Sequence, residues 1–179
     1  MKVLVAVDDS DFSRHALAWV LDHLFPFPAA AADQPAEEPR PALVLVHALE
    51  PLRHIMYPIG PGSAVYGAPS MMQSVRAAQA ENARSLLDRA KRTCHQRGVS
   101  AEVVVVEGEP REALCRAAAD MGAGLLVVGS RGLGAIKRAF LGSVSDYCAH
   151  HASCPIMVVK PPRDDDDDDD DHAHRTEAS

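Results

Sequence analysis

The chain has few aromatic residues and no apolar run long enough to cross a membrane. Phe, Tyr and Trp make up 4% of its 179 residues, whereas hydrophobic residues as a whole make up 47%. A core of normal size is therefore expected, and it must be built from Val, Leu, Ala and Ile. A membrane-spanning helix needs about 20 consecutive apolar residues. The sequence thus predicts one water-soluble domain with some loose ends.

The chain also lacks an excess of basic residues. Its formal net charge of −7 is dominated by a tail that contains the aspartate run Asp164–Asp171. Removing the tail's nine acidic residues and one basic residue from totals of 25 and 18 leaves 16 acidic and 17 basic residues. Binding of duplex nucleic acid needs a basic face. Neither nucleic acid nor a membrane is therefore predicted as a partner.

Two further absences concern the cellular compartment. The N-terminus enters an apolar segment at Lys2 without the pattern of a signal peptide. No two cysteines have CxxC spacing, and the four cysteines are Cys94, Cys115, Cys148 and Cys154. This usage is typical of reduced thiols in the cytosol rather than of a disulfide framework. We expect a cytoplasmic protein.

Short apolar segments alternate with helical patterns along the chain. Strands are expected at 3–7, 43–48, 103–106, 125–128 and 155–159, and helices after Ser10 and over 71–97, 110–121 and 143–150. The strands are almost wholly apolar, which is typical of a parallel sheet covered on both faces. We predict an α/β fold over residues 1–160: an open, doubly wound, Rossmann-like, five-stranded parallel sheet, in strand order 3-2-1-4-5, with helices on both faces.

Three segments do not fit this alternation. Residues 26–41 are rich in Pro, Ala and acidic residues, and we interpret them as a loose loop. Residues 50–70 contain several prolines and glycines and are expected to be irregular. Residues 161–179 form an acidic tail whose composition predicts disorder.

A glycine-punctuated turn follows the fourth expected strand. Gly129 and Gly132 are followed, after nine residues, by Gly142 and Ser143. Glycine lets a backbone approach a ligand closely. Ser143 begins an expected helix, whose first amides could bind a phosphate. The residues alone leave an alternative open, a plain loop in which Ser143 caps that helix.

The better-known phosphate-binding motifs are absent. No GxxxxGK[ST] string occurs, and the dinucleotide pattern GxGxxG fails because Gly132-Leu133-Gly134 is followed by Lys137 where glycine is needed. The turn after the first strand, residues 7–10, contains no glycine.

The motif that does match is that of another family. Gly129, Gly132, Gly142 and Ser143 fit GxxGx9G[ST], the nucleotide motif of the universal stress protein family. The strings Gly129–Gly134 and Cys154–Val159 resemble its plant single-domain members. The resemblance covers residues 1–160 apart from the loop at 26–41. It implies a stress-response protein that binds ATP or AMP and acts as a sensor or signalling module towards an unknown partner.

The resemblance also implies site residues. Asp8 would contact the ribose or a phosphate-bound Mg ion, Ala48 the adenine through its backbone, and Val128 the ribose side. The phosphates would be held by Gly129, Gly132, Gly142, Ser143 and Val144, with Arg131 and Lys137 as further charge partners. Asp8 could instead cap the first helix. One departure is Ala6, where some ATP-binding relatives have proline.

The activity and assembly admit alternatives. A slow ATPase is one, although the sequence offers no clear general base besides Asp8. A redox-linked chaperone that uses the free cysteines is another. The fifth strand, Pro155–Val159, is apolar and lies at a sheet edge in the expected order. Exposed edges of this kind are usually covered, and the resemblance also favours a homodimer through this strand.

Overall fold

The main sheet has the predicted order and direction. In the computed structural model, which describes residues 1–25, 41–51, 56–60, 63–66, 69–132 and 141–161, five parallel strands form one sheet. They are β1 (Lys2–Ala6), β2 (Ala42–Leu49), β5 (Ala101–Glu107), β6 (Leu125–Gly129) and β7 (Ile156–Val159). Their order is β5-β2-β1-β6-β7. Strands β3 and β4 form a separate hairpin. If the five strands of the main sheet are numbered among themselves in chain order, they lie in the order 3-2-1-4-5, and that prediction is confirmed.

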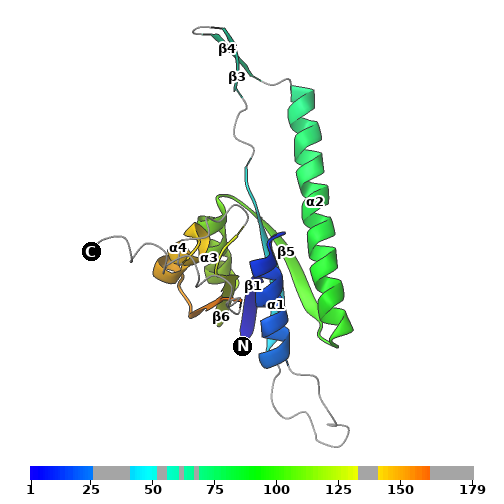
Figure 1. The fold of residues 1–179 in the computed structure, drawn as a ribbon, viewed down its shortest axis with the longest axis vertical. Helices are drawn as coiled ribbons and strands as arrows, with labels where there is room; N and C mark the ends of the chain where they lie inside the picture. The colour runs from blue at the N-terminus through cyan, green and yellow to red at the C-terminus, as the bar shows by residue number, and fades with distance from the viewer. Residues whose placement is uncertain (26–40, 52–55, 61–62, 67–68, 133–140, 162–179) are drawn as a thin grey trace, which may run out of the picture.

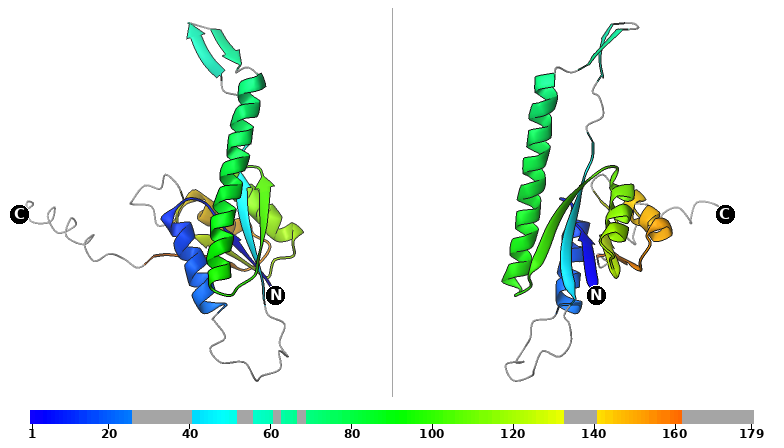
Figure 2. Two further views of the ribbon diagram at one scale, coloured as in Figure 1. Left: turned by 90° about the vertical axis from the view of Figure 1, so that its right-hand side faces the viewer. Right: turned by 180° about the vertical axis from the view of Figure 1, so that it is seen from behind.

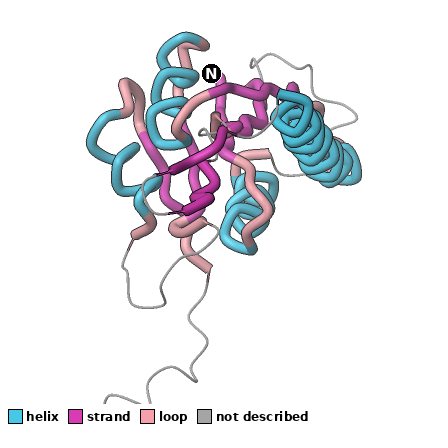
Figure 3. The backbone as a smooth tube through the Cα atoms, turned by 90° about the horizontal axis from the view of Figure 1, so that it is seen from above, coloured by secondary structure: helices cyan, strands magenta, loops and turns pink. Residues whose placement is uncertain are grey.

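Helices cover both faces of the sheet (Figures 1 and 3). The helices are α1 (Asp11–His23), α2 (Pro69–Gln96), α3 (Pro110–Asp120) and α4 (Ser143–His151). Figure 2 shows α2 on one side of the sheet and α3 and α4 on the other. Alternate strand residues face the two layers: Val3 and Val5 pack with residues of α1 and α2, and Leu4 packs with residues of α3 and α4.

The two apolar layers explain the composition of the strands. Val3, Leu4 and Val5 are each 0% exposed, because β1 is central and is covered on both faces. The largest fully buried side chains are leucines, at positions 4, 21, 45 and 126. A core of aliphatic side chains therefore fills the space that aromatic residues occupy in other domains.

An arm formed by a hairpin and by the first half of α2 extends beyond the sheet (Figures 1 and 2). The hairpin pairs β3 (Met56–Gly60) with β4 (Ser63–Tyr66) in antiparallel fashion. The prediction of an irregular segment over 50–70 is therefore wrong at these strands. A two-stranded ribbon has an unpaired side along each strand, so a proline such as Pro58 is tolerated there.

The second half of α2 packs on the sheet. Its buried residues recur at helical spacing and are Ala83, Leu86, Leu87, Ala90 and Cys94. The predicted loop at 26–41 and the predicted acidic tail lie, apart from residues 41 and 161, outside the described residues.

The strand order sets the place of a binding site. The chain passes from β1 to β2 on one side of β1, and β6 pairs on the other side, with Val5 opposite Val127. In open parallel sheets, ligands bind at the carboxyl ends of strands at such a reversal. The turns after β1 and β6, which contain Asp8 and Gly132, meet at this point.

Candidate functional site

A cavity of about 740 Å³ lies at the carboxyl ends of β1, β2 and β6. The turns after β1 and β6 line it, together with parts of α2, α3 and α4. The cavity brings together nine residues that the sequence singles out: Asp8, Ala48, Val128, Gly129, Arg131, Gly132, Gly142, Ser143 and Val144. Lys137 lies outside the described residues. This volume lies within the range of about 300 to 1,000 Å³ that is typical of small-molecule sites.

Asp8 is held rigidly at the end of β1. Its Oδ1 accepts hydrogen bonds from the Ser10 amide at 2.9 Å and the Ser10 hydroxyl at 2.5 Å. Ser10, not Asp8, is the N-cap of α1, and its Oγ accepts from the Ser13 amide at 3.1 Å. The other carboxylate oxygen, Oδ2, faces Gly132, where an added Cβ would lie 3.1 Å from it. Asp8 therefore presents one carboxylate oxygen between the two turns.

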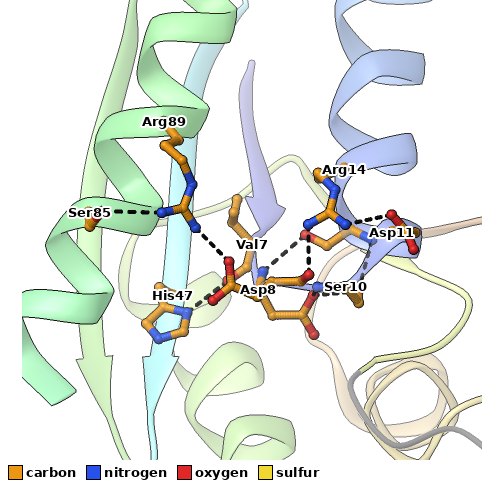
Figure 4. Close-up of polar contacts among 10 residues, drawn as sticks. Val7, Asp8, Ser10, Asp11, Arg14, His47, Ser85 and Arg89 are labelled. Carbon is orange, nitrogen blue, oxygen red and sulfur yellow. Dashed lines mark hydrogen bonds and ion pairs between the residues drawn. The ribbon is translucent and has the colours of Figure 1, made fainter.

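The next residue, Asp9, pairs with Arg89 of α2, which Figure 4 shows beside the turn after β1. Arg89 of α2 forms an ion pair with Asp9 at 2.6 Å and donates a hydrogen bond to Ser85 Oγ at 3.2 Å. Both charged side chains are about half exposed, so the pair contributes little to stability. The pair marks where α2 passes the turn after β1, and the position of this helix, one wall of the cavity, is set by its buried residues such as Leu86 and Leu87.

His47 is a half-buried histidine at the cavity wall. Its Nδ1 lies 2.8 Å from the carbonyl oxygen of Val7, which can only accept a hydrogen bond. The hydrogen therefore resides on Nδ1, and Nε2 is the remaining polar atom of the ring. The structure thus satisfies one ring nitrogen through the backbone and places His47 at the cavity.

The three motif glycines are needed for space. None has positive φ. A Cβ on Gly129 would lie 2.8 Å from the backbone carbon of Phe12, so α1 packs directly against the end of β6. A Cβ on Gly142 would lie 3.1 Å from Arg131 Cα. Gly142 also donates a hydrogen bond to the Ser130 carbonyl at 2.7 Å, so the two ends of the turn lie side by side.

The first turn of α4 has no side-chain cap. Its N-cap is Gly142, and Ser143 is the first helical residue. The alternative in which Ser143 caps this helix is therefore wrong. Ser145 is buried, and its hydroxyl lies 2.9 Å from the Gly142 carbonyl and 3.1 Å from the Ser130 carbonyl. The first turn of α4 thus lines the cavity and its first amides have no capping side chain, an arrangement suited to binding an anion.

The comparisons identify the family. Residues 1–160 match the universal stress protein family. The chain belongs to this family. The universal stress protein A-like protein of Arabidopsis thaliana is 34% identical over 97 residues, which is 54% of this chain and 55% of that protein. Universal stress protein YxiE of Bacillus subtilis is 30% identical over 159 residues, which is 89% of this chain and 98% of that protein.

Solved structures of universal stress proteins share the fold. A family member from Arabidopsis thaliana with AMP bound is 25% identical, with a TM-score of 0.60 over 93% of this chain and 94% of that one. A universal stress protein in complex with cAMP is 26% identical, with a TM-score of 0.56 over 89% of this chain and 96% of that one. In the part of this chain that the structure describes, no helix is long and apolar enough to span a membrane.

The universal stress protein motif does not include every residue at the cavity. Glu109, Pro110 and Leu114 at the start of α3, and Gln79 and Asn82 in α2, also line it. The start of α3 could have been found from topology, because α3 follows β5 at the same edge of the sheet. Gln79 and Asn82 lie in α2 at helical spacing from the buried Leu86, so the periodicity of the helix places them on its sheet-facing side, although it does not show that they reach a cavity.

The charges around this site are mixed. Asp8, Asp9, Glu50 and Glu109 line the cavity together with Arg131, whose guanidinium lies 5.7 Å from the Phe12 ring centroid. Among the described residues, no group of three or more His, Cys, Asp or Glu side chains is arranged to hold a metal ion. A divalent cation here would therefore need ligand oxygens from a bound molecule besides Asp8.

Gly129→Ala tests the close packing of α1 on this turn. Backbone atoms of Phe12 would lie within 3 Å of the new methyl group, so we expect the free energy of unfolding to fall by about 1–3 kcal/mol. Gly132→Ala is the matched control, because the new Cβ would meet only a side-chain oxygen, that of Asp8. Its free energy of unfolding should therefore fall by less than that of Gly129→Ala. Urea unfolding followed by circular dichroism measures both. Equal stability of the Gly129 variant and the wild type would contradict this account of the turn.

Proposed function

We propose that this protein binds an adenine nucleotide, ATP or AMP, in the cavity at the ends of β1, β2 and β6. The observation that carries the proposal is the uncapped first turn of α4, which lines this cavity together with Asp8. Backbone amides at a helix N-terminus are hydrogen-bond donors in a positive partial field, which suits a phosphate. The two similar universal stress proteins crystallised with AMP and cAMP support an adenine ligand.

In this proposal each wall of the cavity binds a different part of the nucleotide. The phosphates bind at Gly129, Gly132, Gly142, Ser143 and Val144, with Arg131 and Lys137 as further charge partners. Asp8 and Val128 contact the ribose, and Ala48 contacts the adenine through its backbone. With ATP, Asp8 can also share a Mg ion with the phosphates, because its Oδ2 faces the phosphate turn.

The proposed cellular role is that of a sensor or signalling module in the cytoplasm during stress. The nucleotide state would be passed to a partner protein that binds near the cavity. This role fits a site in which the nucleotide is held mainly by backbone groups rather than by catalytic side chains.

Gly132→Val tests the position of the phosphates. The glycine lies beside Asp8 Oδ2 at the cavity wall, so a valine side chain would occupy the space between the two turns. We expect ATP affinity, measured by calorimetry, to fall by about tenfold or more, or 1.4 kcal/mol. Ala149→Val on the exposed side of α4 is the control and should bind as the wild type does. Unchanged affinity of the Gly132 variant would place the phosphates elsewhere.

Hydrolysis should be slow. Asp9 is paired with Arg89, and Asp8 has one carboxylate oxygen engaged with Ser10, while the other would contact the ribose or a Mg ion in this proposal. No clear general base is then left for an attacking water. No lysine of a P-loop is present to stabilise charge on the transferred phosphoryl group. We expect turnover of ATP well below about 1 per second, the low end for ordinary enzymes. Phosphate release at or above that rate would identify the protein as an ATPase.

We also propose a homodimer through the edge strand, within residues Pro155–Val159. Ile156, Met157 and Val158 are only partly buried. The carbonyl of Pro155 accepts a hydrogen bond from the Leu126 amide of β6, and that of Val159 accepts one from the Ser130 amide directly after β6. Because strand residues direct their backbone groups to alternate sides, the amides of Ile156 and Val158 point away from β6, towards a second copy.

Val158→Pro tests this pairing. Proline removes a donor on the outer side of β7 and leaves the bonds to β6 in place. We expect the wild type to sediment as a dimer at micromolar concentration and the variant to shift towards monomer. Ser153→Pro, in the loop before β7, is a control for the general effect of proline. A wild type that remains a soluble monomer at this concentration would exclude the proposed dimer.

A further inference from the structure

Three of the four cysteines gather on one side of the sheet. Cys148 of α4 is a buried member of the apolar layer under α3 and α4, and Cys115 of α3 and Cys154 pack against the same layer. Cys94 lies in the opposite layer, under α1 and α2. All four thiols are free. The topology therefore concentrates thiols in one layer, although they are far apart in the sequence.

Two of these thiols are in direct contact. The Cys115 thiol donates a hydrogen bond to Cys148 Sγ at 3.6 Å. The Cys148 thiol in turn lies 3.8 Å from the Arg111 carbonyl oxygen. The two sulfur atoms come from neighbouring helices, α3 and α4, which pack against each other. A disulfide has an S–S length of about 2.05 Å, so closure requires a movement of about 1.5 Å.

The two thiols differ in their access to solvent. Cys148 is 0% exposed, whereas Cys115 is partly exposed. Burial, followed by the hydrogen bond from Cys115, raises the pKa of the Cys148 thiol to about 12. Cys148 therefore remains a thiol at neutral pH, and a small oxidant reaches Cys115 first.

We propose that Cys115 and Cys148 form a reversible disulfide when the protein meets peroxide, and that this bond lowers the affinity of the neighbouring cavity for nucleotide. The disulfide depends only on the contact between the two sulfur atoms. Its effect on nucleotide binding rests on the proposed function.

The reaction has two steps and consumes one hydrogen peroxide. The Cys115 thiolate attacks one peroxide oxygen, the O–O bond breaks, and a sulfenic acid forms while the released hydroxide takes up a proton to give water. Cys148 then loses its proton and attacks the Cys115 sulfur. The S–O bond breaks, the S–S bond forms, and a second water leaves. Two thiols are oxidised by two electrons, and a dithiol reductant reverses the change.

Both helices of the pair begin at the cavity. Leu114, directly before Cys115, lines the cavity, as do Ser143 and Val144 in the first turn of α4. Cys148 follows Val144 by about one helical turn. Drawing Cys148 towards α3 therefore moves the amides proposed to hold the phosphates. We expect the oxidised protein to bind ATP at least about fivefold more weakly than the reduced protein.

Peptide mapping tests the disulfide. Trypsin releases Cys115 within residues 112–116, but Cys148 and Cys154 share one peptide that begins at Ala139. The full-length Cys154→Ser protein is therefore treated with a small excess of hydrogen peroxide, alkylated and digested. We expect one linked pair, between residues 112–116 and the peptide of Cys148, which disappears after treatment with dithiothreitol. The wild type should give the same link in tandem spectra.

Matched variants decide the outcome. Cys115→Ser should abolish the link, and Cys94→Ala, which alters a buried thiol in the opposite layer, should retain it. Alkylation of both Cys115 and Cys148 after peroxide treatment would overturn the proposal, as would a wild-type link that joins Cys115 to Cys154. Circular dichroism of each variant checks that it is folded before oxidation.

Calorimetry with ATP tests the coupling. The oxidised and the reduced wild type are compared, and Cys115→Ser with and without peroxide is the control that should show no change. Equal affinity of the linked and the reduced wild type would overturn the coupling while leaving the disulfide in place. If reduced protein binds no ATP, the proposed function fails, and the peptide map still decides whether the disulfide forms.

Discussion

The close contact between Gly129 and the start of α1 is the constraint on which the candidate site depends. Only a residue without a Cβ lets the Phe12 backbone approach the end of β6 this closely. That approach brings the turn after β1 beside the turn after β6, so Asp8 Oδ2 lies next to Gly132. The cavity exists because two turns, more than 100 residues apart in the chain, are held together at this point.

Much of the fold follows from the sequence because its main signals are local. The runs Val3–Val5 and Leu126–Val128 are apolar on both faces, and this pattern predicts central parallel strands. Glycine spacing likewise indicated the turn at 129–143. The hairpin of β3 and β4 was missed because proline and glycine are typical of irregular segments. Glu109, Gln79 and the contact of Cys115 with Cys148 were also missed, since they depend on how distant elements pack.

The charges at the cavity restrict how a phosphate can be bound. Asp8, Asp9, Glu50 and Glu109 would repel a polyanion, and one of them, Asp9, is neutralised by Arg89. Arg131 supplies a positive charge at the cavity wall. In the proposed complex, backbone amides would therefore provide much of the attraction. Such a site discriminates by shape and hydrogen bonding more than by net charge.

The missing cap of α4 has a steric cause. Serine, threonine, asparagine and aspartate are preferred at an N-cap, and their loss typically costs about 1 kcal/mol. At Gly142 a Cβ would lie 3.1 Å from Arg131 Cα and 3.4 Å from the Ser130 carbonyl oxygen, so a capping side chain would crowd the backbone of the turn. The close pairing of the two ends of the turn therefore disfavours a cap at this helix. The helix gives up local stability where an anionic ligand can restore it, because a ligand that binds only the folded state stabilises that state.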